Sequence, residues 1–437
     1  MKAFLRSSET KKSQKLGLSV LAGASIFMLA ACSTGGGGET STDPSTEPST
    51  SSAAPVGSDT AHVDGVLKIG TILPQTGNLA FLGPPEFAGV DLAAADIEAA
   101  DYEFEVEILH RDSGDTTTQI AIQSATDLIN QDVDVVIGAA SSGVSFTFIN
   151  QLVEANVIQI SPANTSPDFT TYEDNGIFWR TAPSDVLQGR VLGNLMVQDG
   201  AESVGFIYVN DPYGIGLEAN ASEAIEAAGG EVVASIPYNP GETSFTTQVD
   251  ELISSGATAV GVLAFQETAS IIPELVNTQG FPASGVYFVD GNLSNDYDFP
   301  AGTLEGAKGT LPGNPADDSF QARLLEVDPN LNDFSYAAES YDAVIVAALA
   351  AAQGGSDDAE TIKANMQSVT TGGTKCTSFA ECYDLIKAGE DIDYDGVSGP
   401  IEFDENGDPT EAYIGIYQYG ADNKYTLLNA EFGSLNE

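Results

Sequence analysis

Basic residues are scarce in this sequence of 437 residues. Lys and Arg together number 15 and Asp and Glu 64, so the formal net charge is −49 at pH 7. A chain this acidic repels phosphate groups, which makes nucleic acids and anionic membrane surfaces poor partners. We expect most of the acidic side chains on a solvated surface.

Histidine and cysteine are also rare, with two and three residues. His62 lies in a low-complexity stretch, which leaves His110 for a Ser-His-acid arrangement, and no Gly-x-Ser-x-Gly motif occurs. Cys376 and Cys382 offer too few ligands for zinc, and in an exported protein they are expected to form a local disulfide. We therefore expect no enzyme, no cofactor and no metal centre.

No apolar run is long enough to span a bilayer comfortably. The run from Leu16 to Ala30 is too short, and a basic stretch precedes it. It ends in Leu29-Ala30-Ala31-Cys32, which resembles the lipobox of bacterial lipoproteins and implies cleavage before Cys32 and its lipidation. We interpret 1–31 as a lipoprotein signal peptide, with a plain signal peptide as the alternative. Its removal would leave a formal charge of about −53.

Residues 32–62 are rich in Gly, Ser, Thr and Pro and contain little that could be buried. This composition is typical of a flexible tether. Together with Cys32, it predicts a protein at the cell surface or in the periplasm, held to the membrane through a lipid anchor.

One stretch combines a buried strand with a hydroxyl-rich turn. Residues 135–138 are apolar, residues 141–145 are small and polar, and helical spacing follows to Glu154. The first amides of a helix lack internal partners and carry the positive end of its dipole. Ser142 and the Gly143 backbone are therefore predicted to receive a carboxylate. A second such turn, 161–167, follows the strand 157–160; the alternative is that these residues only cap helices.

Strands and helices alternate along the rest of the chain. We predict helices at 85–100, from a cap at Asp115 to Asn130, and at 185–198, among others, and a terminal hairpin in which 400–403 and 413–419 flank the turn 404–408. Alternation of this kind predicts an α/β fold of mostly parallel sheets with helices on both faces. Ligands of such sheets bind at the carboxyl ends of the strands.

The order of several motifs resembles the type I periplasmic solute-binding proteins of the branched-chain amino-acid ABC-transporter family, over about 66–428. The motifs are Ile69-Gly70 with Pro74 and Thr76-Gly77, Ser161 to Pro167, Arg180 to Asp185 with Gln188-Gly189, and Asp211 to Gly216. The resemblance implies two doubly wound, Rossmann-like lobes joined by three crossovers. Lobe 1 would comprise 66–182 and 312–398, and lobe 2 would comprise 183–311 and 399–430.

The resemblance also implies which residues hold the carboxylate of a ligand. In amino-acid-binding members, the turn equivalent to Ser142 and Gly143, the backbone at Ala163 and the hydroxyl of Thr165 do so. Ser142 and Thr165 could instead serve only as helix caps.

The opposite end of the ligand would meet lobe 2. Tyr213 would pack on it, and Asp290, where the family often has Glu, would pair with the ammonium. Phe265 stands where amino-acid binders often place Tyr, and Phe81 or Leu82 where an aromatic residue lines the side-chain pocket. The alternatives are a packed loop aromatic for Tyr213, a turn residue for Asp290, and core or rim positions for the others.

Two further motifs suggest other chemistry. Gly214-Ile215-Gly216 with Ala219 is a loose dinucleotide fingerprint. Asp391, Asp393, Asp395, Gly396 and Glu402 have the spacing of an EF-hand calcium loop. A structural role for 391–402 and calcium binding both remain open, because a similar run precedes a crossover strand in the family.

We therefore expect a substrate-binding lipoprotein of an ABC importer. It would capture a branched-chain or similar neutral amino acid, or a related amide, in the interlobe cleft and deliver it to the permease. The alternative is a ligand-sensing receptor that signals to a membrane partner without transport. A surface hydrolase is disfavoured by the scarcity of histidine.

Overall fold

The computed structural model describes residues 63–435. The predicted signal peptide, Cys32 and the predicted tether lie outside this range. Within it, no helix combines the length and the apolar character that crossing a membrane requires.

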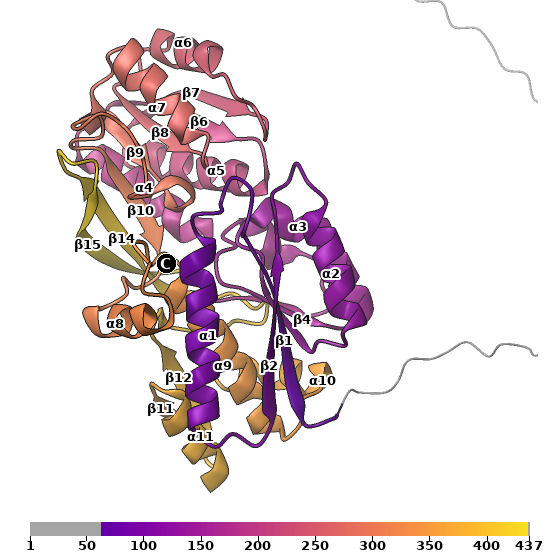
Figure 1. The fold of residues 1–437 in the computed structure, drawn as a ribbon. Helices are drawn as coiled ribbons and strands as arrows, with labels where there is room; N and C mark the ends of the chain where they lie inside the picture. The colour runs from indigo at the N-terminus through magenta and orange to yellow at the C-terminus, as the bar shows by residue number, and fades with distance from the viewer. Residues whose placement is uncertain (1–62, 436–437) are drawn as a thin grey trace, which may run out of the picture. The chain divides into compact units, whose positions relative to one another are not determined.

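The first lobe is built on a five-stranded parallel sheet (Figure 1). Its central strands are short, largely apolar and completely buried, as a parallel sheet covered on both faces requires. The order across the sheet is β2 (Glu105–Asp112), β1 (Val66–Leu73), β3 (Val135–Gly138), β4 (Ile158–Ser161) and β5 (Phe178–Arg180).

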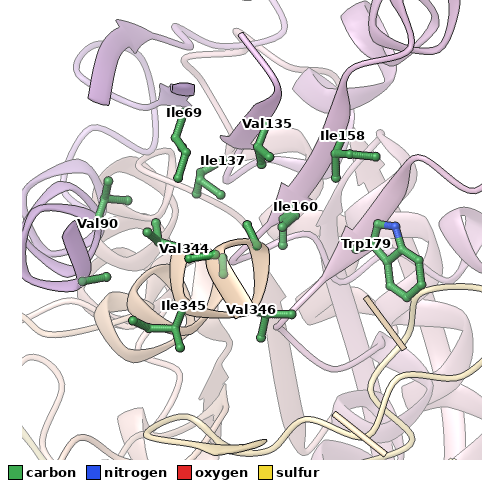
Figure 2. Close-up of a cluster of buried hydrophobic side chains, with 14 of the residues drawn as sticks. Ile69, Val90, Val135, Ile137, Ile158, Ile160, Trp179, Val344, Ile345 and Val346 are labelled. Atoms are coloured by element: carbon green, nitrogen blue, oxygen red, sulfur yellow. The ribbon is translucent and has the colours of Figure 1, made fainter. Parts of the chain in front are cut away.

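Helices from two parts of the sequence cover this sheet. Those between its strands are α1 (Gly83–Ala99), α2 (Ile120–Asn130) and α3 (Ser142–Ala155), with the 3-10 helix η1 (Pro167–Thr171). The other helices of this lobe follow β10 in the sequence. They are α8 (Asp318–Val327), α9 (Ala337–Gly354), α10 (Ala359–Asn365) and α11 (Phe379–Ala388). Small residues let the buried α9 approach the sheet closely, and Figure 2 shows Ile137 and Ile160 gathered with Val344 of α9.

The second lobe is built on a seven-stranded sheet. Its order is β15 (Tyr425–Ser434), β14 (Glu411–Tyr419), β10 (Lys308–Pro312), β9 (Val286–Phe288), β8 (Ala259–Leu263), β6 (Ser203–Val209) and β7 (Glu231–Tyr238). Strands β6, β7, β8, β9 and β10 run parallel to one another. Strands β14 and β15 add an antiparallel edge beside β10.

The helices of the second lobe connect these strands. They are α4 (Asp185–Gln198), α5 (Pro212–Ala227), α6 (Thr246–Ser254), α7 (Thr268–Ile272), the π-helix η2 (Pro273–Thr278) and the 3-10 helices η3 (Ala283–Gly285) and η4 (Asp290–Asn292). The bounds of α4 are those that the sequence predicts, because Ser184 accepts the N–H of Val186 as its cap.

Two local predictions are wrong. The helix expected from Asp115 begins at Ile120, because the Asp115 carboxylate instead closes a turn by accepting the N–H and hydroxyl of Thr117. In the terminal hairpin, β14 pairs with β15 rather than with 400–403. The segment 404–408 is a local turn in which the Asp404 N–H donates to the carbonyl of Asp408 at 2.9 Å.

A small third sheet contains the disulfide. Strand β11 (Thr374–Cys376) runs parallel to β12 (Ile392–Gly396), which pairs antiparallel with β13 (Gly399–Pro400). The predicted bond between Cys376 and Cys382 is present and ties β11 to α11.

The calcium-loop interpretation of 391–402 is wrong. Asp393 and Asp395 lie on strand β12 instead of in a loop, and the ammonium of Lys375 contacts them at 3.1 and 2.9 Å and Glu402 at 3.8 Å. Between residues 63 and 435, no group of three or more acidic, His or Cys side chains is placed to hold a metal ion. These carboxylates therefore form a cluster of ion pairs around Lys375.

Several carboxyl groups are buried in the first lobe. Burial raises the pKa of Asp134 to about 7 and that of Asp342 to about 6. The pKa of Glu86 lies well above its usual value because of burial and the neighbouring charge of Glu339, and neither Glu86 carboxylate oxygen has a hydrogen-bond partner among the described residues. Each of these groups favours its protonated form in the folded state.

We expect the protein to become more stable as the pH falls from 7.5 to 5. The folded pKa of these groups exceeds the unfolded value of about 4, so the folded state binds more protons between those values and stability is lost as the pH rises. Differential scanning calorimetry should show the melting temperature rising on acidification, with a flatter dependence in Glu86→Gln. Glu98→Gln, an exposed position on the same helix, is the control. Identical slopes in all three proteins would contradict this account.

Candidate functional site

Residues of both lobes enclose a small cavity where the strands of the two sheets end. Its described lining is Leu79, Leu82, Ala140, Ser141, Ser142, Ala163 and Tyr336 from the first lobe, and Tyr213, Phe265, Asp290 and Gly291 from the second. About 10 Å³ is open in it, close to the room that one water molecule needs. None of these lining residues is basic. An amino acid can therefore occupy the site only if the lobes or the lining side chains move apart.

The two hydroxyl-rich turns meet at one wall of this cavity. Ser141 caps α3 by accepting the N–H of Val144, whereas the hydroxyl of Ser142 accepts the N–H of Ser166 at 3.3 Å. Ala163 lines the same wall, and its N–H already donates to Ser161 Oγ at 3.2 Å. Ser142 thus joins the first turn to the second instead of capping a helix, whereas Ser166 caps η1 by accepting the N–H of Asp168.

Thr165 and Gly143 stand behind this wall rather than in the lining. The Thr165 hydroxyl is buried beside the Asp185 carboxyl, but it makes no hydrogen bond of standard geometry with the described residues. A side chain at Gly143 would come within 3.1 Å of Asp211 Oδ2 from the second lobe. Gly143 therefore permits close approach of the two lobes beside the site.

Asp290 lies at the opposite wall and is held by three donors. Its carboxylate accepts hydrogen bonds from Gln188 Nε2 at 2.9 Å, from the Tyr213 hydroxyl at 2.8 Å and from the Tyr336 hydroxyl at 2.7 Å. Burial raises the pKa of Asp290, and these donors oppose that rise. Tyr336 belongs to the first lobe, so its bond to Asp290 joins the two lobes.

Aromatic and aliphatic side chains form the remaining wall. Tyr213 and Phe265 stack with ring centroids 5.3 Å apart and an interplanar angle of 17°. Leu79 and Leu82 face them across the cavity lining, whereas Phe81 is only partly buried, against the core of the second lobe. Of the two residues that the sequence proposed for this pocket, the structure thus places Leu82 in the lining and Phe81 outside it.

Sequence reasoning missed Asp185 as a candidate site residue. It is the first residue of α4, is fully buried, and neither carboxylate oxygen accepts a hydrogen bond of standard geometry from a described residue. Its backbone N–H donates to the carbonyl of Thr165 at 2.7 Å, which places it beside the second turn. The only signal in the sequence was an acid after Pro183-Ser184, which also suits a helix start.

The pKa of Asp185 lies well above its usual value. Burial is the main cause, and the negative charge of Asp290 adds to it. Ionising two buried acids that lie close together costs free energy, because both charges are desolvated and they repel each other. A cation bound between them lowers that cost. The arrangement can therefore receive a positive group at the acids and a negative group at the hydroxyl-rich turns.

The family model described as "Periplasmic binding protein" matches residues 66–424. The Leu/Ile/Val-binding protein homolog 2 of Brucella abortus is 26% identical over 370 residues, covering 83% of this chain and 93% of its own. The chemotactic signal transduction system substrate-binding protein BasB of Halobacterium salinarum is 24% identical over 361 residues, covering 79% and 85%.

The fold is likewise similar to solved structures. The leucine-binding protein LivK of Thermotoga maritima superposes with a TM-score of 0.70 at 22% identity, covering 83% of this chain and 98% of its own. The two α/β lobes and the enclosed cavity agree with these matches, and such relatives are substrate-binding proteins rather than enzymes. This chain therefore belongs to the type I periplasmic binding proteins of the branched-chain amino-acid family.

Proposed function

We propose that this protein captures a neutral amino acid outside the cytoplasm and delivers it to an ABC permease. The observation that carries the proposal is the carboxyl group of Asp185, which is fully buried near Asp290 and accepts no hydrogen bond of standard geometry from the described residues, although the Thr165 hydroxyl is its neighbour. A buried carboxylate of this kind is stabilised by an ammonium group.

The other end of the ligand would lie at the hydroxyl-rich turns. Ser142 stands on that side, and the positive end of the α3 dipole points toward it, whereas the Thr165 hydroxyl lies beside the Asp185 carboxyl. The apolar wall of Leu79, Leu82 and Phe265 separates the charged ends and would contact an aliphatic side chain.

Ligand contacts from both lobes would favour the closed state. Leu82 and Ser142 come from the first lobe and Tyr213 and Asp290 from the second, so a bound solute gains both sets only when the lobes close. A permease would then distinguish the closed, loaded protein from the open one.

A thermal-shift screen of the purified protein tests the ligand class. All neutral amino acids, small amides and benzoate should be compared at equal concentrations, since a ligand that binds only the folded state raises the melting temperature. We expect an aliphatic amino acid to produce the largest shift. If benzoate alone raises the melting temperature, no ammonium is required and the proposed role of the buried acids fails.

A sensory role is the second candidate. The relative BasB is named for a chemotactic signal transduction system, and lobe closure can signal to a membrane partner as readily as it can load a permease. Deletion of the gene should abolish uptake of the identified ligand if the protein serves transport. Normal uptake with a lost behavioural response would favour sensing.

We also propose that Cys32 carries a lipid that anchors the protein. The support is the sequence Leu29-Ala30-Ala31-Cys32 and the composition of 32–62. Cys32→Ala should release the protein from the membrane fraction.

A further inference from the structure

A second, larger cavity lies between the two lobes. It has a volume of about 390 Å³ and is lined by the entry to α9, by 311–316, and by residues of strands β14 and β15. We propose that this cavity binds a small organic cation bearing one or two amino groups. The proposed site is separate from the cavity that contains Ser142 and Asp290.

Two buried carboxyl groups and the exposed Asp318 make the lining of this cavity acidic. Asp333 and Glu339 line it and are 5% and 3% exposed. The Asp333 carboxylate accepts the N–H of Ser335 and the Tyr425 hydroxyl, whereas the Glu339 carboxyl packs against the Gly313 backbone. Burial raises the pKa of both, which a bound cation would reverse.

A weakly bonded hydroxyl is a second sign of a ligand. Ser335 Oγ lines the cavity and is buried, and Asp333 and Tyr425 lie within reach of it, but neither makes a hydrogen bond of standard geometry with it. A ligand N–H that donates to this hydroxyl would supply the well-formed hydrogen bond that the described residues do not.

The rest of the lining suits an organic ammonium. The tyrosines 336, 417 and 425 and Phe334 supply aromatic surface, and the side-chain amides of Asn314 and Gln321 stand among them. Aromatic faces attract ammonium groups, and amide oxygens accept their protons. None of the described lining residues is Lys, Arg or His; Lys424 lies outside the lining, and its ammonium donates to the backbone carbonyl of Asn295.

The arrangement fits an organic cation better than a metal ion. In the described part of the chain, no three acidic, His or Cys side chains converge closely enough for metal binding. A cavity of this volume lies within the usual size range of ligand pockets and instead suits a small molecule that carries amino groups.

Tyr336 connects the two cavities. It lines both, and its hydroxyl donates to Asp290 at 2.7 Å. Its backbone has φ of 60° at the start of α9, a conformation that a bulky residue adopts only when its surroundings impose it. A cation beside Tyr336 would therefore influence how Asp290 is held.

Isothermal titration of the full chain with 1,4-diaminobutane tests the proposal. We expect saturable binding of one molecule, weakened at least tenfold by Glu339→Gln and by Asp333→Asn. Glu326→Gln, an exposed position on α8, removes the same charge and should leave the affinity unchanged. Asn314→Arg, at an exposed position of the lining, should also block binding by supplying a cation, and it keeps the test valid if the buried variants fail to fold.

Non-specific attraction to an acidic protein is the main competing explanation. Equal affinity in Glu326→Gln and Asn314→Arg, or loss of all binding in 1 M NaCl, would overturn the site. Equal binding of 1,4-butanediol would show that no charge is recognised, and a stronger response to Mg²⁺ than to the diamine would exclude an organic cation. Asp185→Asn should leave diamine binding intact, which separates this result from any failure at the amino-acid site.

Discussion

Replacing Asp408 by Asn is expected to lower the free energy of unfolding by about 3–5 kcal/mol. Asp408 and Arg180 form a buried pair with both side chains at most 1% exposed, joined by hydrogen bonds of 2.6 and 2.9 Å. Removing one charge leaves the guanidinium buried without its counterion, and that desolvation penalty determines the size of the effect.

The Arg180 side chain also supports the ligand site. Its Nη1 donates to the carbonyls of Asn164 and Ser166 at 3.2 and 2.8 Å, on either side of Thr165. The pair therefore holds the second hydroxyl-rich turn in place, and Asp408→Asn should weaken ligand binding as well as the fold.

Urea unfolding of the Asp408→Asn protein, compared with the unmodified one, measures this loss. Glu360→Gln breaks the exposed pair with Lys363 and should change stability by less than about 0.5 kcal/mol. The double variant Arg180→Met/Asp408→Leu should recover part of the loss, since it leaves no unpaired charge. A loss no larger than that of Glu360→Gln would contradict a buried, strongly coupled pair.

Replacing Asp185 by Asn is expected to weaken amino-acid binding about 100-fold, while the ligand-free protein becomes more stable. A buried charge-assisted hydrogen bond contributes about 1.5–3 kcal/mol, and the upper part of that range corresponds to such a change in affinity. In the absence of ligand, the same substitution removes a buried carboxyl that accepts no hydrogen bond of standard geometry from a described residue, although the Thr165 hydroxyl lies beside it. The two effects have opposite signs.

Isothermal titration with the amino acid found in the screen measures the first effect, and calorimetric melting without ligand measures the second. Asp168→Asn, at an exposed position on η1, makes the same chemical change outside the cavity and should alter neither. Unchanged affinity in Asp185→Asn would assign the ammonium to Asp290 alone. A less stable ligand-free protein would mean that Asp185 has a structural role instead.

Local signals predicted most elements of the fold. Helix α4 begins where the sequence predicts because the serine cap at Ser184 acts on neighbouring residues. The terminal hairpin was mispredicted because the turn 404–408 is a good local turn but lies outside the paired strands. The residue types of a turn show where the chain reverses direction. They do not show which strands pair with each other.

Some features of the candidate site were likewise predictable from the sequence, and others were not. The sequence by itself determined the two hydroxyl-rich turns, the cysteine pair and the alternation that predicts parallel sheets, because each depends on residues close together in the chain. Only the tertiary structure decided that Asp185 is buried beside Thr165, that Tyr336 donates to Asp290, and that Arg180 pairs with Asp408 across 228 positions. Burial and partnership set the charge state of a carboxyl group, and both come from elements that meet only when the chain has folded.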